Sequence, residues 1–135
     1  MAMSAQEKFD YWLDIAQYDL QTAEAMLTSG RWLYVAFMCQ QAVEKLVKGL
    51  YLLYLDDNVP RVHNIQAIVK RFRDKLPVEI PPDTIDLFGT LSTCYMNNRY
   101  PDFKKALASQ INEAKAKKLY SQTKEVFAWL LTLKP

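Results

Sequence analysis

The stretch MCQQAVEKLVKGLY, residues 38–51, has the spacing of a buried helix, yet two polar residues fall on its apolar surface. Steps of three and four residues along it define two neighbouring helical stripes. The first stripe is apolar throughout and consists of Val35, Cys39, Ala42, Leu46, Gly49 and Leu53. The second is interrupted by an amide and a carboxylate, and consists of Leu33, Phe37, Gln40, Glu44, Val47, Tyr51 and Tyr54. The sequence therefore predicts a buried helix over about 32–55 that carries a polar gap.

Similar apolar spacing predicts further helices on either side, over about 5–29, 65–72, 83–97 and 102–133. Asp83 is the expected N-cap of the helix at 83–97, with Asp86 at capping-box spacing. The chain has only three glycines and lacks the alternation and hairpin turns of strands. We therefore predict an all-α single domain over 1–135. Because short connections force neighbouring helices to run antiparallel, its expected architecture is an up-down four-helix bundle with one additional short helix.

The composition predicts one globular domain without a membrane segment. Half of the 135 residues (50%) are hydrophobic, which is enough to build a real core. The net charge of +2 gives no whole-chain signal for nucleic acid. No apolar run approaches the ~20 residues of a membrane span, and the first residues lack the apolar middle of a secretion signal, so a cytoplasmic location is expected.

The cysteines and the histidine give no indication of a metal site. Cys39 and Cys94 both lie in apolar helical contexts, where buried free thiols are expected in a reducing compartment. Neither cysteine has metal-ligand spacing to another Cys or to His63, which is the only histidine. We therefore expect neither a metal nor a cofactor.

The polar gap needs partners, because a buried carboxylate is costly unless it is paired. Lys48 lies four residues after Glu44, at the spacing of a helical ion pair. Arg99 and His63 are the candidate partners from elsewhere in the chain. His63 lies in the segment RVHN before a predicted helix, and Arg99 lies in NNRYPD, residues 97–102. We predict that the polar gap faces a pocket near these two segments; a purely structural pairing with a neighbouring loop is the alternative.

Several motifs occur along the chain in an ordered set. They are WLDIAQYDLQTAEAML from Trp12, Ala36-Phe37 followed by QQAVEKLVKGLYL, HNI at 63–65, and NNRYPD at 97–102. This set resembles the HEPN family, the helical "higher eukaryotes and prokaryotes nucleotide-binding" domain. The resemblance implies a five-helix unit with a four-helix up-down bundle, commonly a homodimer. It also implies a prokaryotic toxin–antitoxin-like system in which the partner protein is a minimal nucleotidyltransferase.

Many proteins of that family are metal-independent RNases, whose signature is an arginine followed after four to six residues by a histidine. None of the five arginines here has a histidine at that spacing, and YPDFKKA follows Arg99 where the signature would fall. We therefore interpret the chain as a nucleotide- or RNA-binding and interaction module. One alternative is an RNase toxin with a rearranged site of Arg99 and His63. The other is a dimeric helical adaptor that has no ligand.

The candidate site residues follow from this interpretation. Arg99 and His63 are the catalytic candidates, should there be catalysis. The candidate ligand-binding residues are Arg99, Tyr100, Asp102, His63, Asn64, Glu44, Gln40 and Lys48. Arg99 is expected to present its planar fork to a phosphate while Tyr100 stacks on a base; an ion pair of Arg99 with Glu44 or Asp102 is the alternative. Aromatic residues outside the main stripes favour a protein interface, and they include Tyr11, Tyr18, Trp32, Tyr34 and Trp129.

Overall fold

All the regular elements in residues 2–96 and 101–135, which the computed structural model describes, are helices. They are α1 (Ala5–Thr28), α2 (Trp32–Tyr54), α3 (Ile65–Lys70), the 3-10 turn η1 (Arg73–Lys75), α4 (Pro82–Ser92), α5 (Pro101–Gln110) and α6 (Glu113–Leu131). The predicted all-α fold is confirmed. No helix in the described ranges combines the length and the apolar character needed to cross a membrane.

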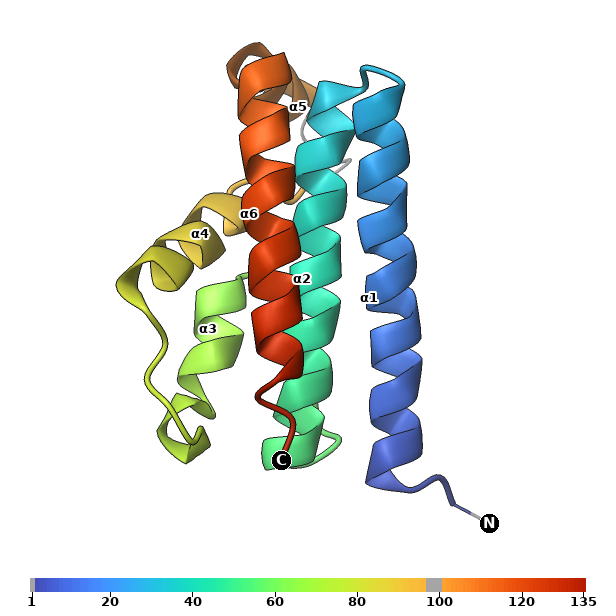
Figure 1. The fold of residues 1–135 in the computed structure, drawn as a ribbon, viewed down its shortest axis with the longest axis vertical. Helices are drawn as coiled ribbons and strands as arrows, with labels where there is room; N and C mark the ends of the chain where they lie inside the picture. Colours follow the sequence, from blue (N-terminus) through green and yellow to red (C-terminus); the bar gives the residue numbers. More distant parts are fainter. Residues whose placement is uncertain (1, 97–100) are drawn as a thin grey trace.

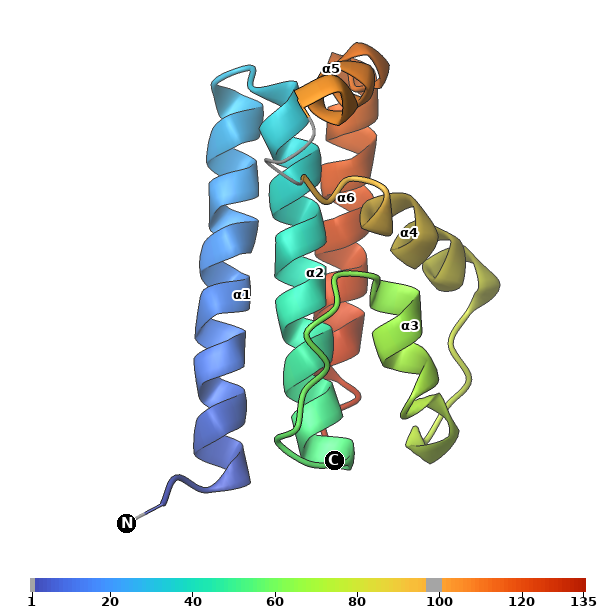
Figure 2. The same ribbon diagram turned by 180° about the vertical axis from the view of Figure 1, so that it is seen from behind.

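Three long helices, α1, α2 and α6, lie side by side along the long axis of the molecule, with α2 in contact with both of the others (Figure 1). The shorter helices α3 and α4 cover the side away from α1, and α5 lies across one end (Figure 2). Fourteen of the 23 residues of α2 are buried, which makes it the central helix. The polar gap identified in the sequence therefore lies in the most enclosed element of the fold.

The first two helices pack closely because small residues face each other across their interface. The buried residues of α1 are Phe9, Ala16 and Ala23, which are seven residues apart and share one face. On α2, Gly49 lies against Phe9, and a side chain added at this glycine would come within 3.0 Å of the phenylalanine ring. The turn between the two helices contains Gly30 at φ 74°, a conformation that L side chains rarely adopt. Sequence and geometry thus agree on a tight α1–α2 hairpin.

The predicted helix over 102–133 is in fact two helices, α5 and α6. The break comes at Asn112, whose extended backbone ends the helical run and whose side chain accepts the Lys115 N–H at 2.9 Å as the N-cap of α6. Leu107 and Ile111 are buried before the break, and Ala116 and Leu119 are buried after it. An asparagine that competes for backbone donors ends helices, so the apolar spacing alone predicted one helix where the chain turns.

Helix α4 also differs from its predicted range of 83–97. Pro82 is its first residue, a position that suits proline, so Asp83 lies in the first turn and is not the N-cap. The helix ends at Ser92, where the Ser92 and Thr93 hydroxyls donate to the carbonyls of Phe88 and Thr90. Such bonds from side chain to backbone weaken a helical end. The chain consequently leaves α4 earlier than expected and brings the segment around Tyr95 back toward α2.

Candidate functional site

The polar gap of α2 is a hydrogen-bonded cluster around Glu44. Gln40, Glu44 and Lys48 lie four residues apart on one face of the helix, and all three are buried. The Glu44 carboxylate accepts the Gln40 amide N–H at 2.7 Å and the Lys48 ammonium at 3.0 Å. The side-chain amide of Gln41 in turn donates to the side-chain oxygen Oε1 of Gln40 at 2.6 Å. With only 1% of Glu44 exposed, these donors replace the water that the carboxylate loses on folding.

His63 completes the cluster from the segment between α2 and α3. Its Nδ1 lies 3.1 Å from Oε1 of Glu44, and its backbone carbonyl accepts the Gln40 amide at 3.2 Å. A carboxylate can only accept, so Nδ1 carries the hydrogen in this contact. The His63 side chain is 46% exposed. The contacts with Glu44 and Gln40 thus fix the orientation of an imidazole that reaches solvent. We call the four residues the polar cluster: Gln40, Glu44, Lys48 and His63.

A row of aromatic rings continues from the imidazole. The His63 and Tyr95 rings are stacked, with centroids 3.8 Å apart and an interplanar angle of 11°. The ring centroids of Tyr95 and Phe37 are 6.1 Å apart, and those of Phe37 and Tyr34 are 6.3 Å apart. The ammonium of Lys104 on α5 lies 5.6 Å from the centre of the Tyr34 ring, a cation–π distance. We call His63, Tyr95, Phe37 and Tyr34 the aromatic row; it runs from the polar cluster toward α5.

Comparison of the sequence with family models assigns the chain to a protein family. The family model for the HEPN domain matches residues 9–133, which is most of the chain. The chain belongs to the HEPN family. The crystal structure of TT1696 from Thermus thermophilus resembles this HEPN domain with a TM-score of 0.78 and 25% sequence identity, over 93% of this chain and 97% of that one.

A second solved structure shares the fold of this HEPN domain. It is ST0689, described as an archaeal HEPN homologue, with a TM-score of 0.71 over 94% of this chain and 98% of that one. Its sequence identity is 23%, so the likeness concerns the fold alone. Among proteins of curated function, none matches the sequence.

The structure brings some, but not all, of the predicted site residues of the HEPN domain into contact. It brings Gln40, Glu44, Lys48 and His63 together, although they come from two separate segments. Asn64 lies beside them in sequence, but its side chain caps α3 by accepting the Ala67 N–H at 3.0 Å. The Asn64 side chain therefore has a structural task that sequence reasoning did not assign to it.

Of the remaining candidates, Asp102 is the one that the structure describes. It is exposed in the first turn of α5, where a carboxylate complements the positive end of the helix dipole. Arg99 and Tyr100 fall outside the described residues, and so does the expected pairing of Glu44 with Arg99. Within the described ranges, no group of three His, Cys, Asp or Glu side chains is placed to hold a metal ion.

Sequence reasoning missed two neighbours of the polar cluster. Tyr95 stacks on His63 only because α4 ends early, and helical spacing had placed it inside that helix. Asp19 of α1 is half-buried near the same place. Burial raises the pKa of the Asp19 carboxyl, with an opposing effect from Lys45 and a smaller reinforcing one from Glu44. The sequence did contain a signal for Asp19. It is an acidic residue between Ala16 and Ala23, the small residues that α1 buries against α2.

Proposed function

We propose that this HEPN domain is a nucleotide- or RNA-binding and interaction module whose binding centre is the polar cluster with Tyr95. The observation that carries the proposal is an imidazole that is close to half exposed and yet held in place on two sides. Glu44 binds one edge of the ring, and Tyr95 stacks on one face. A ring fixed in this way needs little reorganisation to receive a planar base or a phosphate oxygen.

The aromatic row supports RNA as the longer ligand. Single-stranded nucleic acid is bound by rings on which bases stack and by cations that follow the backbone. Here Tyr34 is exposed at the far end of the row, with Lys104 over its ring. The aromatic row therefore offers stacking surfaces for bases and, at its far end, a positive charge for the phosphate backbone of a short single strand.

The test is the binding of a fluorescein-labelled single-stranded RNA, followed by fluorescence anisotropy at fixed salt. Tyr95→Leu removes a stacking ring and is expected to weaken binding by about 5- to 150-fold, because one base–aromatic contact contributes about 1–3 kcal/mol. Tyr95→Phe keeps the ring and is the matched control, with affinity close to that of the unchanged protein. His63→Ala should behave like Tyr95→Leu. Equal affinities for all four proteins would contradict this binding centre.

The RNase alternative has its own test. We expect the isolated chain to cleave little or no RNA, because the arginine-to-histidine spacing that marks the family's RNases is absent. Labelled RNA is incubated with the protein in excess EDTA and resolved on a denaturing gel. Robust cleavage that disappears in His63→Ala would assign the polar cluster to catalysis instead of binding.

The proposal extends to partners and location. The family resemblance supports a minimal nucleotidyltransferase as partner in a prokaryotic toxin–antitoxin-like pair, and co-purification with the product of the neighbouring gene tests it. Two buried free thiols, Cys39 and Cys94, support a cytoplasmic location. A homodimer is supported by the exposed side chains of Ile15 and Tyr18 on α1.

A further inference from the structure

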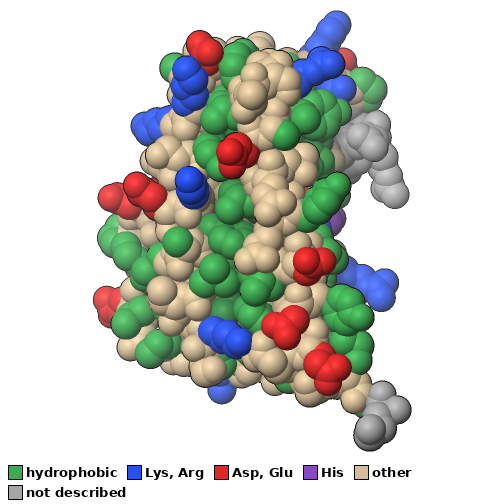
Figure 3. All heavy atoms as spheres, turned by 45° about the vertical axis from the view of Figure 1, so that its right-hand side comes forward, with side chains coloured by type: hydrophobic (Ala, Val, Ile, Leu, Met, Phe, Trp, Pro, Cys, Tyr) green, Lys and Arg blue, Asp and Glu red, His purple; other side chains and the backbone are tan. Residues whose placement is uncertain are grey.

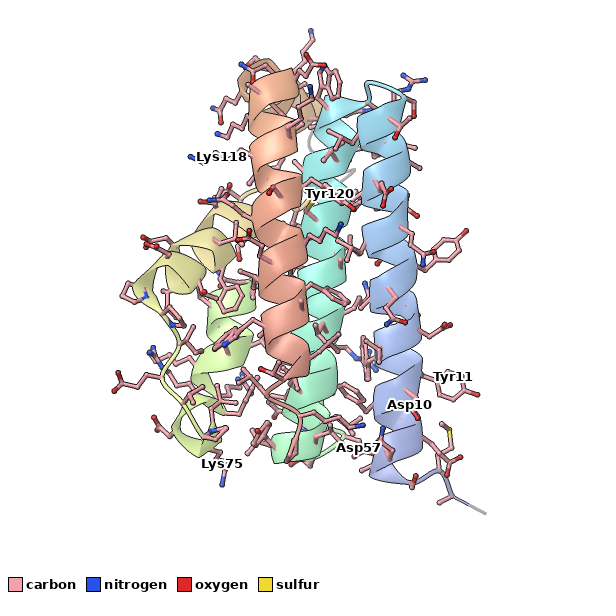
Figure 4. All side chains as sticks on the ribbon, viewed as in Figure 1. Asp10, Tyr11, Asp57, Lys75, Lys118 and Tyr120 are labelled. Atoms are coloured by element: carbon pink, nitrogen blue, oxygen red, sulfur yellow. The ribbon has the colours of Figure 1, made fainter. Side chains whose placement is uncertain are left out.

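A pocket of about 480 Å³ lies beside the polar cluster, between the first turns of α1, the lower part of α2 and the segment that follows α2. Its size is in the range of small-molecule sites, about 300–1,000 Å³. The lining residues that matter here are Lys8, Tyr11, Trp12, Lys48, Asp57 and Arg61. Tyr11 and Asp57 lie at the same end of the molecule, Tyr11 on the side of α1 and Asp57 in the segment after α2 (Figure 4). We call this the Lys48 pocket.

The charges of the Lys48 pocket favour an anion. Lys8, Lys48 and Arg61 line it, against one acid, Asp57. Asp57 is engaged by Lys8, and Lys48 is engaged by Glu44 of the polar cluster. Arg61 is exposed, and no carboxylate in the described part of the chain forms an ion pair with it. Its guanidinium is therefore available to a phosphate, for which its fork geometry is well suited.

The walls of the pocket favour a planar ring. Tyr11 is 64% exposed and Trp12 is partly buried beside it, while Leu52, Val59 and Pro60 supply apolar surface. Aromatic faces next to cations suit a ligand that carries both a ring and a negative charge. A bare anion would leave the aromatic wall unused, and an uncharged ring would leave Arg61 unused.

We propose that the Lys48 pocket binds a nucleoside monophosphate, with the phosphate on Arg61 and the ring against Tyr11 and Trp12. This deepens the proposed function, because it assigns a phosphate subsite next to the polar cluster. Lys48 connects the two, since it lines the pocket while its ammonium is bonded to Glu44. The subsite itself does not use His63 or Tyr95, so the two proposals can fail separately.

The test is a titration of the full chain with AMP, observed through the indole N–H signals of the tryptophans in a ¹⁵N NMR spectrum. Trp12→Phe assigns the Trp12 signal. We expect AMP to shift this signal and leave that of Trp129 unmoved, with affinity at least tenfold above adenosine and above inorganic phosphate. Arg61→Gln should remove the advantage of AMP over adenosine. Lys75→Gln, which removes a charge outside the pocket, should leave it unchanged.

The variants separate this proposal from the proposed function. Lys48 is left intact, because its removal would also strip Glu44 of a partner. His63→Ala should leave AMP binding at Trp12 as it is, even where RNA binding is lost. An unmoved Trp12 signal, equal affinities for AMP and adenosine, or inorganic phosphate binding as tightly as AMP would each overturn the proposal. Loss of AMP binding in His63→Ala would overturn it as well, since the ligand would then lie at the polar cluster.

Discussion

Glu44 is the residue on which the polar cluster depends, because it alone contacts the other three members. Its carboxylate accepts from Gln40, Lys48 and His63 while lying in the central helix. A buried pair of charges is not in itself strong evidence for stability, since both partners lose their hydration. Breaking the pair is different, because one charge then stays buried alone.

Glu44→Ala should therefore lower the free energy of unfolding by about 3–5 kcal/mol, the range for removing one partner of a buried pair. The remaining Lys48 ammonium has only 8% of its side chain exposed. Glu113→Ala is the matched control, because Glu113 also forms an i,i+4 pair with a lysine, Lys117, but both side chains are more than half exposed. The control should cost less than about 0.5 kcal/mol. Urea unfolding of both variants measures the difference, and similar losses would show that burial does not strengthen this pair.

Cys39 gives the protein a predictable response to alkaline pH. Burial raises the pKa of its thiol from 9.0 to about 12. The unfolded chain loses this proton near pH 9 while the folded protein keeps it, so the unfolded state is favoured as the pH rises between these values. The stability tied to Cys39 is complete below pH 9 and is lost by about 12, at a rate of up to about 1.4 kcal/mol per pH unit.

Urea unfolding at pH 8.5 and at pH 10.5 tests this response. Cys39→Ala should lose less stability between the two pH values than the unchanged protein, whatever its absolute stability. Burial also raises the pKa of Tyr120 to about 12, with a contribution from its bond to Glu24, but this residue titrates in both proteins and cancels in the comparison. The same pH dependence in both proteins would mean that the Cys39 thiol is not protected in the folded state.

At the scale of the element, the packing of α1 on α2 depends on the absence of a side chain at Gly49. A Cβ there would lie 3.0 Å from the Phe9 ring and 3.1 Å from Cβ of Trp12, both on α1. Gly89 in α4 is the informative contrast. A Cβ there would meet, at 3.0 Å, only the far end of the exposed Gln66 side chain, whose amide donates to the Ile85 carbonyl.

Gly49→Ala and Gly89→Ala should accordingly change stability in opposite directions. Alanine gains about 1 kcal/mol over glycine inside a helix. At Gly89 this gain should largely survive, whereas at Gly49 overpacking of about 1–3 kcal/mol should outweigh it. Thermal unfolding of the two variants gives the signs directly. A stabilised Gly49→Ala protein would show that the α1–α2 interface yields to a methyl group at little cost.

The elements also show where apolar spacing stops being informative. It predicted α1 and α2 closely, because long stripes bury against neighbours along their whole length. It joined α5 to α6, because apolar residues are buried both before and after the break at Asn112, with Ile111 on one side and Ala116 on the other. It extended α4 past Ser92, because hydroxyl bonds to the backbone leave no trace in apolar spacing.

At the scale of the whole molecule, the sequence predicted the direct partners of Glu44 and missed the neighbours whose position depends on where helices end and how they pack. The Glu44–Lys48 pair is a matter of i,i+4 spacing, so it was predictable. His63 was predicted as a candidate partner, together with Arg99, because a buried carboxylate needs a cation. The stacking of Tyr95, in contrast, requires knowing where α4 ends, and the half-burial of Asp19 requires knowing how α1 lies on α2.

Among the residues that the structure describes, none packs against one face of the molecule. Helix α1 packs on α2 and on part of α6, and its outer side meets solvent. Two large side chains share that side at i,i+3 spacing, beyond the Lys48 pocket: Ile15 at 45% and Tyr18 at 71% exposed. Figure 3, which brings this part of the molecule forward, shows hydrophobic and acidic side chains side by side. Aromatic residues gathered on a surface are typical of protein interfaces.

We expect the protein to be a homodimer that uses this face of α1. In light scattering at micromolar concentration the unchanged chain should have about twice its monomer mass of 15.7 kDa. The double variant Ile15→Glu/Tyr18→Glu should have the monomer mass, because it buries two uncompensated charges in the interface. Tyr11 is left intact, so AMP binding at the Lys48 pocket can be measured in the same protein. Val78→Glu is the control, since the exposed fraction of Val78, 50%, lies between those of Ile15 and Tyr18, and Val78 belongs to the segment before α4, so the dimer should stay intact. A monomeric unchanged chain would exclude the homodimer, and a dimer that survives in the double variant would move the interface to another surface.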